Sequence, residues 1–280
     1  MQSGRPNTSL YAPRGFPQAS ATFVPWQRWL LLLVPVLLLL LLVVNHHTTL
    51  IWLNAVVMLL YLFSMVYRTL LIDISLRKTR DISIEPHELN PPNGVSWPRY
   101  LVLVPVYKEG DILPELVMSL NRLDYPKERL EIRLLIEEDD EETMAAAERF
   151  KLSRPFVIFP IPVSQPRTKP KACNVGLQNT TADFLVIFDA EDRPDPDQLK
   201  KAVVAFNRVP RNIACIQAKL NFYNSDHNFL TRGFTAEYAT WFDLCLPGLD
   251  FFKAPIPLGG TSNHFRVDVL KQVGGWDEYN

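Results

Sequence analysis

Two long stretches near the start of the chain are almost entirely apolar. Residues 29–44 and 50–67 contain no charged side chain, and the first is nearly all Leu and Val. Each is close to the roughly 17–25 residues that a helix needs to cross a bilayer. A short polar sequence, Asn-His-His-Thr-Thr at 45–49, separates them. The pattern predicts a hairpin of two transmembrane helices within residues 26–72.

Positive charges flank these stretches but are absent from the turn between them. Arg28 precedes the first stretch, Arg68 follows the second, and residues 45–49 contain neither Lys nor Arg. Because flanking Lys and Arg stay on the cytoplasmic side, we predict an integral protein of the cytoplasmic membrane with both termini and the main domain in the cytoplasm. Residues 1–25, rich in Pro, Ser and Thr, predict a disordered tail, and residues 73–96 predict a linker.

Between residues 97 and 280, short apolar runs alternate with amphipathic stretches, in which apolar residues recur at helical spacing. The runs predict strands at 100–105, 130–136, 156–159, 184–188 and 213–218, and the stretches predict helices near 112–120, 141–151, 171–177 and 196–207. This alternation is typical of an α/β domain with a mostly parallel sheet and helices on both faces. Ligands of such sheets bind beyond the carboxyl ends of the strands.

Polar clusters follow three of the predicted strands, at 106–109, 137–140 and 189–192. In the last cluster Asp189 and Glu191 are one residue apart, so both side chains can point toward one hard cation. Carboxylate oxygens suit Mg²⁺ or Mn²⁺, which proteins usually hold together with a phosphate. A solvated acidic turn is the alternative for this cluster alone. Because three clusters are expected at one sheet edge, they favour a binding site.

Composition narrows the class of ligand. The net charge of −1 gives no electrostatic case for nucleic acid, and the three cysteines have no metal-like spacing and fit free thiols. The chain contains neither the Gly-x-x-x-x-Gly-Lys sequence of P-loop proteins nor the Gly-x-Gly-x-x-Gly of dinucleotide dehydrogenases. Lys169 and Lys171 offer positive charge to a phosphate, unless they are ordinary surface lysines. Carboxylates for a metal and lysines for phosphate together suggest a nucleotide diphosphate.

Several motifs within residues 97–280 occur in the order found in a known family. They are Val-Pro-Val-Tyr-Lys-Glu at 104–109, the acidic turn 137–140, Lys-Pro-Lys-Ala-Cys-Asn at 169–174, Asp-Ala-Glu-Asp at 189–192, and Gly-Gly-Thr-Ser-Asn-His-Phe-Arg at 259–266, followed by Gly-Gly-Trp at 274–276. The set resembles the membrane-anchored family 2 glycosyltransferases of the cellulose-synthase-like group of bacterial polysaccharide synthases. The resemblance implies a GT-A fold and an inverting transfer from a nucleotide-diphosphate sugar, commonly a UDP-sugar, to a growing glycan or a lipid acceptor at the cytoplasmic membrane face.

The resemblance also implies roles for individual residues. It places Pro105, Tyr107, Glu109, Glu138, Asp139, Lys171 and Asp189 around the nucleotide sugar, Thr261, Asn263 and His264 near the donor sugar or acceptor, and Asp189 with Glu191 on Mg²⁺ or Mn²⁺. Either Glu138 or Asp139 would contact the base, and Lys171 would approach the diphosphate. Glu191 stands where the family usually has Asp, which puts the metal geometry in question.

The general base that inversion requires is absent from the matching positions. In the family it is usually the Asp of a Thr-Glu-Asp segment shortly after the Gly-Gly-Trp element, and neither Asp277 nor Glu278 matches that segment. We therefore expect the base beyond Asn280. The chain would then be an N-terminal portion of a longer enzyme, with little or no activity by itself.

Residues 228–246 carry aromatic and apolar side chains at helical spacing. The spacing predicts a helix that packs these side chains into the core. The alternative is that Tyr238 or Trp241 stacks on a sugar ring in an acceptor channel.

Two further functions compete with glycosyl transfer. A nucleotidyltransferase that makes sugar nucleotides shares the α/β sheet and metal site, but the membrane hairpin and the lack of an amino-terminal Gly-rich phosphate loop argue against it. A non-catalytic, membrane-bound nucleotide-sugar binding or assembly subunit fits a chain without the expected base.

Overall fold

The computed structural model describes residues 19–78, 81–89 and 96–280, so the tail predicted at 1–18 and parts of the predicted linker lie outside the described residues. The chain divides into two compact units. The α/β unit comprises Ile82–Ala218 and Leu258–Asn280, and the helical unit comprises Ala21–Asp81 and Lys219–Pro257. Residues 219–257, which lie within the predicted domain 97–280, thus group with the apolar amino-terminal helix.

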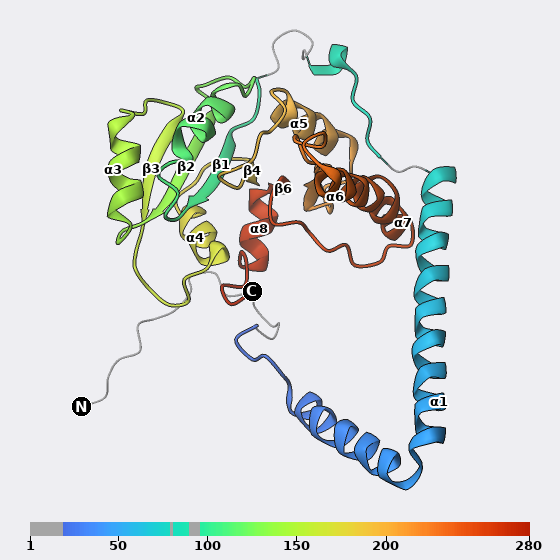
Figure 1. Ribbon diagram of the computed structural model, residues 1–280. Helices are drawn as coiled ribbons and strands as arrows, with labels where there is room; N and C mark the ends of the chain where they lie inside the picture. Colours follow the sequence, from blue (N-terminus) through green and yellow to red (C-terminus); the bar gives the residue numbers. More distant parts are fainter. Residues whose placement is uncertain (1–18, 79–80, 90–95) are drawn as a thin grey trace, which may run out of the picture. The chain divides into compact units, whose positions relative to one another are not determined.

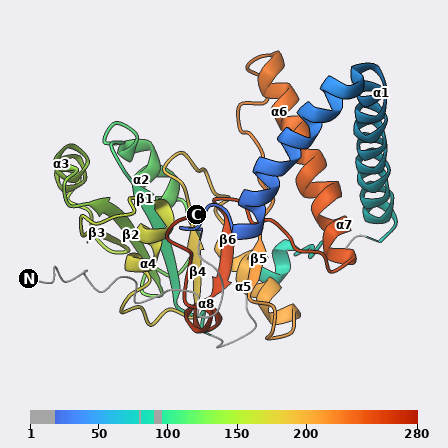
Figure 2. The same cartoon turned by 90° about the horizontal axis from the view of Figure 1, so that it is seen from below.

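A six-stranded sheet forms the centre of the α/β unit (Figure 1). Its strands are β1 (Tyr100–Val106), β2 (Leu130–Glu137), β3 (Phe156–Ile161), β4 (Phe184–Ile187), β5 (Cys215–Gln217) and β6 (Asn263–Arg266). They lie in the order β3-β2-β1-β4-β6-β5, which Figure 2 shows from left to right. The first four strands of this order are parallel, whereas β6 is antiparallel to both β4 and β5. The predicted α/β fold with a mostly parallel sheet is confirmed.

Helices cover both faces of the sheet, as the apolar runs require. One face packs against α2 (Leu113–Asn121), α3 (Glu141–Arg149) and α5 (Gln198–Arg208), and the other packs against α4 (Lys169–Gly176) and α8 (Val267–Val273). Alternate residues of β1 pack on opposite faces of the sheet. Val102 and Val104 are buried in the core on the first face, and Leu101 and Leu103 are buried in the core on the second. Strands buried on both faces are therefore apolar at consecutive positions rather than alternating.

A single element, α1 (Pro25–Arg77), contains both apolar stretches of the sequence. Its backbone leaves the helical region at Asn45, with φ −155° and ψ 85°, and the helix bends sharply there (Figure 1). The Asn45 side chain accepts a hydrogen bond from the Thr48 N–H at 3.1 Å, which is how an N-cap residue begins a new helix. By length and a mean hydropathy of 2.5, α1 is able to cross a membrane, and none of its most apolar window is buried. The hairpin stays a prediction.

The carboxyl end of α1 packs within the helical unit against a broken helix. This consists of α6 (Phe229–Ala239), a π-helical turn η2 (Thr240–Cys245) and α7 (Leu246–Phe251). Leu71 of α1 is buried with Phe242, Leu246 and Leu249. The prediction of aromatic core packing is wrong for α6 itself, because no residue of α6 is buried. Phe229 is 87% exposed.

Candidate functional site

The loops that follow β1 and β2 are joined by hydrogen bonds at the carboxyl edge of the sheet. Asp140 caps the amino end of α3 by accepting the Thr143 N–H at 3.2 Å, and it also accepts the Lys108 N–H at 2.6 Å. Burial acts to raise the pKa of Asp140, but the N–H groups of Lys108 and Thr143 and the Thr143 hydroxyl outweigh it and lower that pKa. Asp140 is thus a structural carboxylate that fixes the loop carrying Tyr107 and Glu109.

The acidic turn after β4 is held by one of its own carboxylates. Asp192 accepts the Asp189 N–H at 2.7 Å and a hydrogen bond from the Thr261 hydroxyl. The Thr261 Oγ1 also lies 3.2 Å from the Ile187 carbonyl oxygen, so the loop before β6 lies against the end of β4. Burial is the main cause of the raised pKa of Asp192. This bonding leaves the side chains of Asp189 and Glu191, rather than that of Asp192, as the turn's candidate carboxylates for a ligand.

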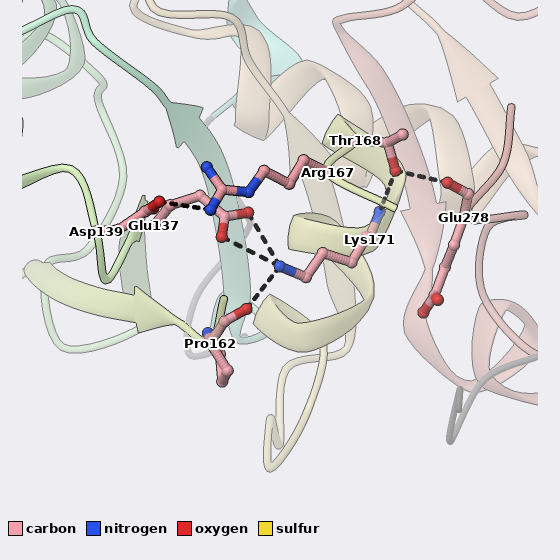
Figure 3. A network of polar contacts seen from close by, with 7 residues as sticks. All are labelled: Glu137, Asp139, Pro162, Arg167, Thr168, Lys171 and Glu278. Atoms are coloured by element: carbon pink, nitrogen blue, oxygen red, sulfur yellow. Dashed lines mark hydrogen bonds and ion pairs between the residues drawn. The ribbon is translucent and has the colours of Figure 1, made fainter. Parts of the chain in front are cut away.

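Two lysines of α4 have different surroundings. Lys171 is 3% exposed, and its Nζ contacts both Glu137 carboxylate oxygens at 3.1 Å and the Pro162 carbonyl at 2.6 Å (Figure 3). Lys169 instead contacts the Asp189 carboxylate, and its Nζ donates to the Gly260 carbonyl at 2.6 Å. The motif resemblance implies that Lys171 approaches the diphosphate, and the structure places the Lys169 ammonium beside Asp189.

Arg167 is a candidate site residue that the sequence motifs did not indicate. Its guanidinium forms an ion pair with Asp139 at 2.5 Å (Figure 3), and a hydrogen bond to Tyr107 helps to raise the Arg167 pKa after the larger effect of Asp139. Arg167 therefore joins two residues that were assigned to the nucleoside pocket. Glu138, the alternative base contact, is exposed, whereas Pro105 is half-buried in β1. The sequence signal that could have pointed to Arg167 is its place two residues before Lys169, just ahead of α4.

The carboxylates at this edge influence one another. Burial raises the pKa of Glu109, and the negative charges of Glu191 and Asp189 raise it further. A third carboxylate, Glu109, thus lies within the electrostatic reach of the predicted metal ligands. Such a group of like charges favours a bound cation.

Two of the carboxylates at this edge are the candidate ligands for the predicted divalent metal. Within residues 19–78, 81–89 and 96–280, no group of three His, Cys, Asp or Glu side chains is arranged to hold a metal by itself. Asp189 and Glu191 nevertheless supply hard oxygen ligands, and the Lys169 ammonium shows that Asp189 binds a cation. The chemistry of these two donors suits Mg²⁺ or Mn²⁺, and an ion held there would take further oxygen ligands from phosphate and water.

His264 is part of the core. It is 1% exposed, its Nδ1 lies 2.6 Å from the Tyr100 hydroxyl, and its Nε2 lies 3.2 Å from the Gln198 amide. Burial lowers the pKa of His264 to about 3, so the ring is neutral. This geometry favours a structural role for His264 over the ligand contact that the resemblance implied.

The other residues assigned to the donor sugar or acceptor lie in two places. Asn263 is buried, and its Nδ2 donates to the Gly259 carbonyl, while its Oδ1 has no hydrogen-bond partner in the described part of the chain. Trp241 belongs to the helical unit, where it is 37% exposed.

Asn174 holds the last described segment, because its side chain exchanges hydrogen bonds with the Trp276 backbone at 2.8 and 2.9 Å.

Comparison with known proteins adds an independent line of evidence. The model of the family described as "Glycosyltransferase like family 2" matches residues 98–280. Glucomannan 4-beta-mannosyltransferase 7 of Arabidopsis thaliana is 24% identical over 192 residues, covering 66% of this chain and 34% of that protein. Glucomannan 4-beta-mannosyltransferase 1 of Oryza sativa subsp. japonica is 25% identical over 205 residues, covering 68% and 38%. The chain thus spans little more than a third of the length of these curated relatives.

A similar solved structure is that of the mannosyltransferase PcManGT from Pyrobaculum calidifontis in complex with GDP-Man and Mn²⁺. Its TM-score is 0.56 at 21% sequence identity, over 77% of this chain and 56% of that one. At this identity the likeness establishes a shared fold.

Proposed function

Because the chain belongs to the glycosyltransferase-like family 2 and has a GT-A-like α/β fold, we propose that it takes part in inverting transfer of a sugar from a nucleotide-diphosphate donor. The observation that carries the proposal is the group of Glu109, Asp189 and Glu191 with the Lys169 ammonium, at the carboxyl edge of the sheet. Such an edge is where open α/β sheets bind ligands. The ordered motifs of the sequence support the same assignment.

The donor is proposed to bind across the loops after β1, β2 and β4. Pro105 and Tyr107 would line the nucleoside pocket. Arg167 and Asp139 would fix the position of the nucleobase. Asp189 and Glu191 would hold Mg²⁺ or Mn²⁺. When bound, this ion would act as a Lewis acid for the departing diphosphate. The Lys169 ammonium would supply fixed positive charge close to the same phosphates.

The reaction itself breaks one bond and forms one bond. The anomeric carbon loses its bond to the β-phosphate oxygen, and the nucleoside diphosphate leaves with that electron pair. An acceptor hydroxyl of a glycan or lipid attacks from the opposite face, and its proton passes to a general base. We assign this general base to none of the described residues. The described residues account for binding of the donor, and donor binding is therefore the step to measure.

The proposed location is the cytoplasmic face of a membrane. The length and hydropathy of α1 and the bend at Asn45 support an anchor, and the positive flanks support a hairpin with both ends in the cytoplasm. A donor made in the cytoplasm would then reach the site without crossing the bilayer.

Calorimetry of the chain in detergent tests the donor site. We expect UDP-sugars or GDP-mannose to bind in the presence of Mn²⁺, the latter included because the curated relatives are named mannosyltransferases. Asp189→Ala should lose this binding, whereas Asp195→Ala, which removes an exposed carboxylate from the same loop, should retain it. A folded wild type that binds none of these donors contradicts the proposal. Donor binding without transfer of the sugar to any acceptor would favour a non-catalytic subunit.

A further inference from the structure

The Lys169–Asp189 ion pair is held between two fixed pieces of backbone. Lys169 is the first residue of α4, directly after Thr168, whose side chain accepts the Lys171 N–H at 3.3 Å and caps the helix. Asp189 is held from the other side by its N–H, which donates to Asp192. The pair therefore results from the local architecture rather than from a chance meeting of two flexible surface chains.

This ion pair is open to solvent, unlike the neighbouring one. The side chains of Lys169 and Asp189 are each 32% exposed, whereas those of Lys171 and Glu137 are 4% and 10% exposed. A partly exposed pair gains less net stability than its contact suggests, because water competes for both charges. A stronger cation can therefore replace the ammonium at Asp189, while the buried pair stays in place.

The position of the ammonium conflicts with a divalent ion on the same carboxylate. Lys169 Nζ contacts Asp189 Oδ1 and the Gly260 carbonyl, which are oxygens of the kind that Mg²⁺ and Mn²⁺ bind. Two cations on one carboxylate repel each other unless an anion is shared between them. A diphosphate is such an anion, because metal and ammonium can bind different phosphate oxygens.

From these contacts, and resting on the proposed donor site, we propose that Lys169 is the counter-ion of Asp189 in the free protein. A divalent metal displaces the Lys169 ammonium from Asp189, and the displaced ammonium then binds the donor diphosphate. Without nucleotide, the ammonium competes with the metal and keeps its affinity low. With nucleotide, the displaced ammonium gains a new partner. Metal and nucleotide therefore bind cooperatively, and by linkage each raises the affinity of the other by the same factor.

Mn²⁺ binding to the 280-residue protein in detergent, followed by the electron paramagnetic resonance signal of free Mn²⁺, tests this role. Lys169→Met should bind Mn²⁺ alone about tenfold more tightly than wild type, a typical size for coupling between sites. UDP or GDP should strengthen Mn²⁺ binding less in this variant than in wild type. Lys169→Arg, which keeps the charge, should stay near wild type.

Lys127→Met is the matched control, because it removes an exposed lysine three residues before β2, at the opposite edge of the sheet. It should leave Mn²⁺ binding unchanged. Thermal unfolding checks that each variant is folded. If Lys169→Met does not fold, Lys169→Gln, which also removes the charge, replaces it in the measurement.

The inference is overturned if a folded Lys169→Met binds Mn²⁺ no more tightly than wild type while Asp189→Ala abolishes that binding. It is also overturned if wild type binds UDP or GDP equally well without metal, since Lys169 would then replace the ion. Tighter Mn²⁺ binding by Lys169→Met in a protein that binds no nucleotide would support the competition and contradict the proposed function instead. The two proposals therefore fail in distinguishable ways.

Discussion

Lys171 and Glu137 form a buried ion pair that stabilises the fold next to the site. Both Glu137 oxygens lie 3.1 Å from the Lys171 Nζ, and the Pro162 carbonyl takes a further hydrogen bond (Figure 3). Removing one partner of such a pair leaves the other charge buried without compensation. Removing both is far less costly.

We therefore expect Lys171→Met to lower the free energy of unfolding by about 3–5 kcal/mol. The double variant Lys171→Met/Glu137→Leu should recover a large part of this loss. Denaturant unfolding of the protein in detergent measures both values. A stable Lys171→Met that only loses donor binding would instead favour the diphosphate contact that the motif resemblance implied.

The sequence indicates candidate ligands of the site more readily than the contacts that each residue makes. Asp189 and Glu191 were assigned as a pair because their spacing and their place after an apolar run are visible in the chain. The roles of Lys169 and Lys171 were not predictable, since both lie two residues apart in one motif. Which lysine reaches Glu137 and which reaches Asp189 depends on how α4 is seated against the sheet, and this follows only from tertiary packing.

At the scale of elements, the close contact between α7 and α1 depends on a glycine. A Cβ at Gly248 would lie 2.5 Å from the Leu71 carbonyl oxygen and 2.9 Å from the Leu71 Cα. These are backbone atoms of a helix, which cannot move aside as a flexible side chain does. Gly233 in α6 provides a comparison, because a Cβ there would meet nothing within 4 Å.

Gly248→Ala should accordingly destabilise the helical unit by about 1–3 kcal/mol, the usual cost of overpacking. Gly233→Ala should be neutral or stabilising by up to about 1 kcal/mol, because Ala favours a helix over Gly. Thermal unfolding of the two variants, matched in chemistry, measures the difference. Equal effects would show that α7 does not pack against α1 through Gly248.

Two elements show where sequence patterns stop being informative. Strand β6 was not predicted, because its residues Asn-His-Phe-Arg lack an apolar run and it gains its place by pairing with β4 and β5. Residues 228–246 were predicted as one core helix, because periodicity identifies an apolar face without saying what covers it. In the structure Phe242 and Leu246 are covered, while Phe229, Leu230 and Phe234 are exposed.

At the scale of the whole molecule, the chain leaves the α/β unit after Ala218 and returns to it at Leu258. The family match, residues 98–280, therefore contributes to both units. Residues 219–257 pack against the end of α1 around Leu71, so the part of the chain that separates β5 from β6 also holds the apolar helix. Residues 219–257, which lie within the family match, therefore pack directly against the helix that is proposed as the membrane anchor.

The hairpin proposal predicts which side of the membrane each unit faces. A cysteine introduced by His47→Cys, in the uncharged turn at the bend of α1, should react with a membrane-impermeant maleimide added outside intact cells. Lys127→Cys, on the exposed surface of the α/β unit, should react only after the cells are made permeable. The native background should be low, because burial raises the pKa of the Cys173 and Cys215 thiols to about 12 and Cys245 is also buried. Labelling of both positions only after permeabilisation would contradict a crossing at residues 45–49, and α1 would then lie on one side of the membrane.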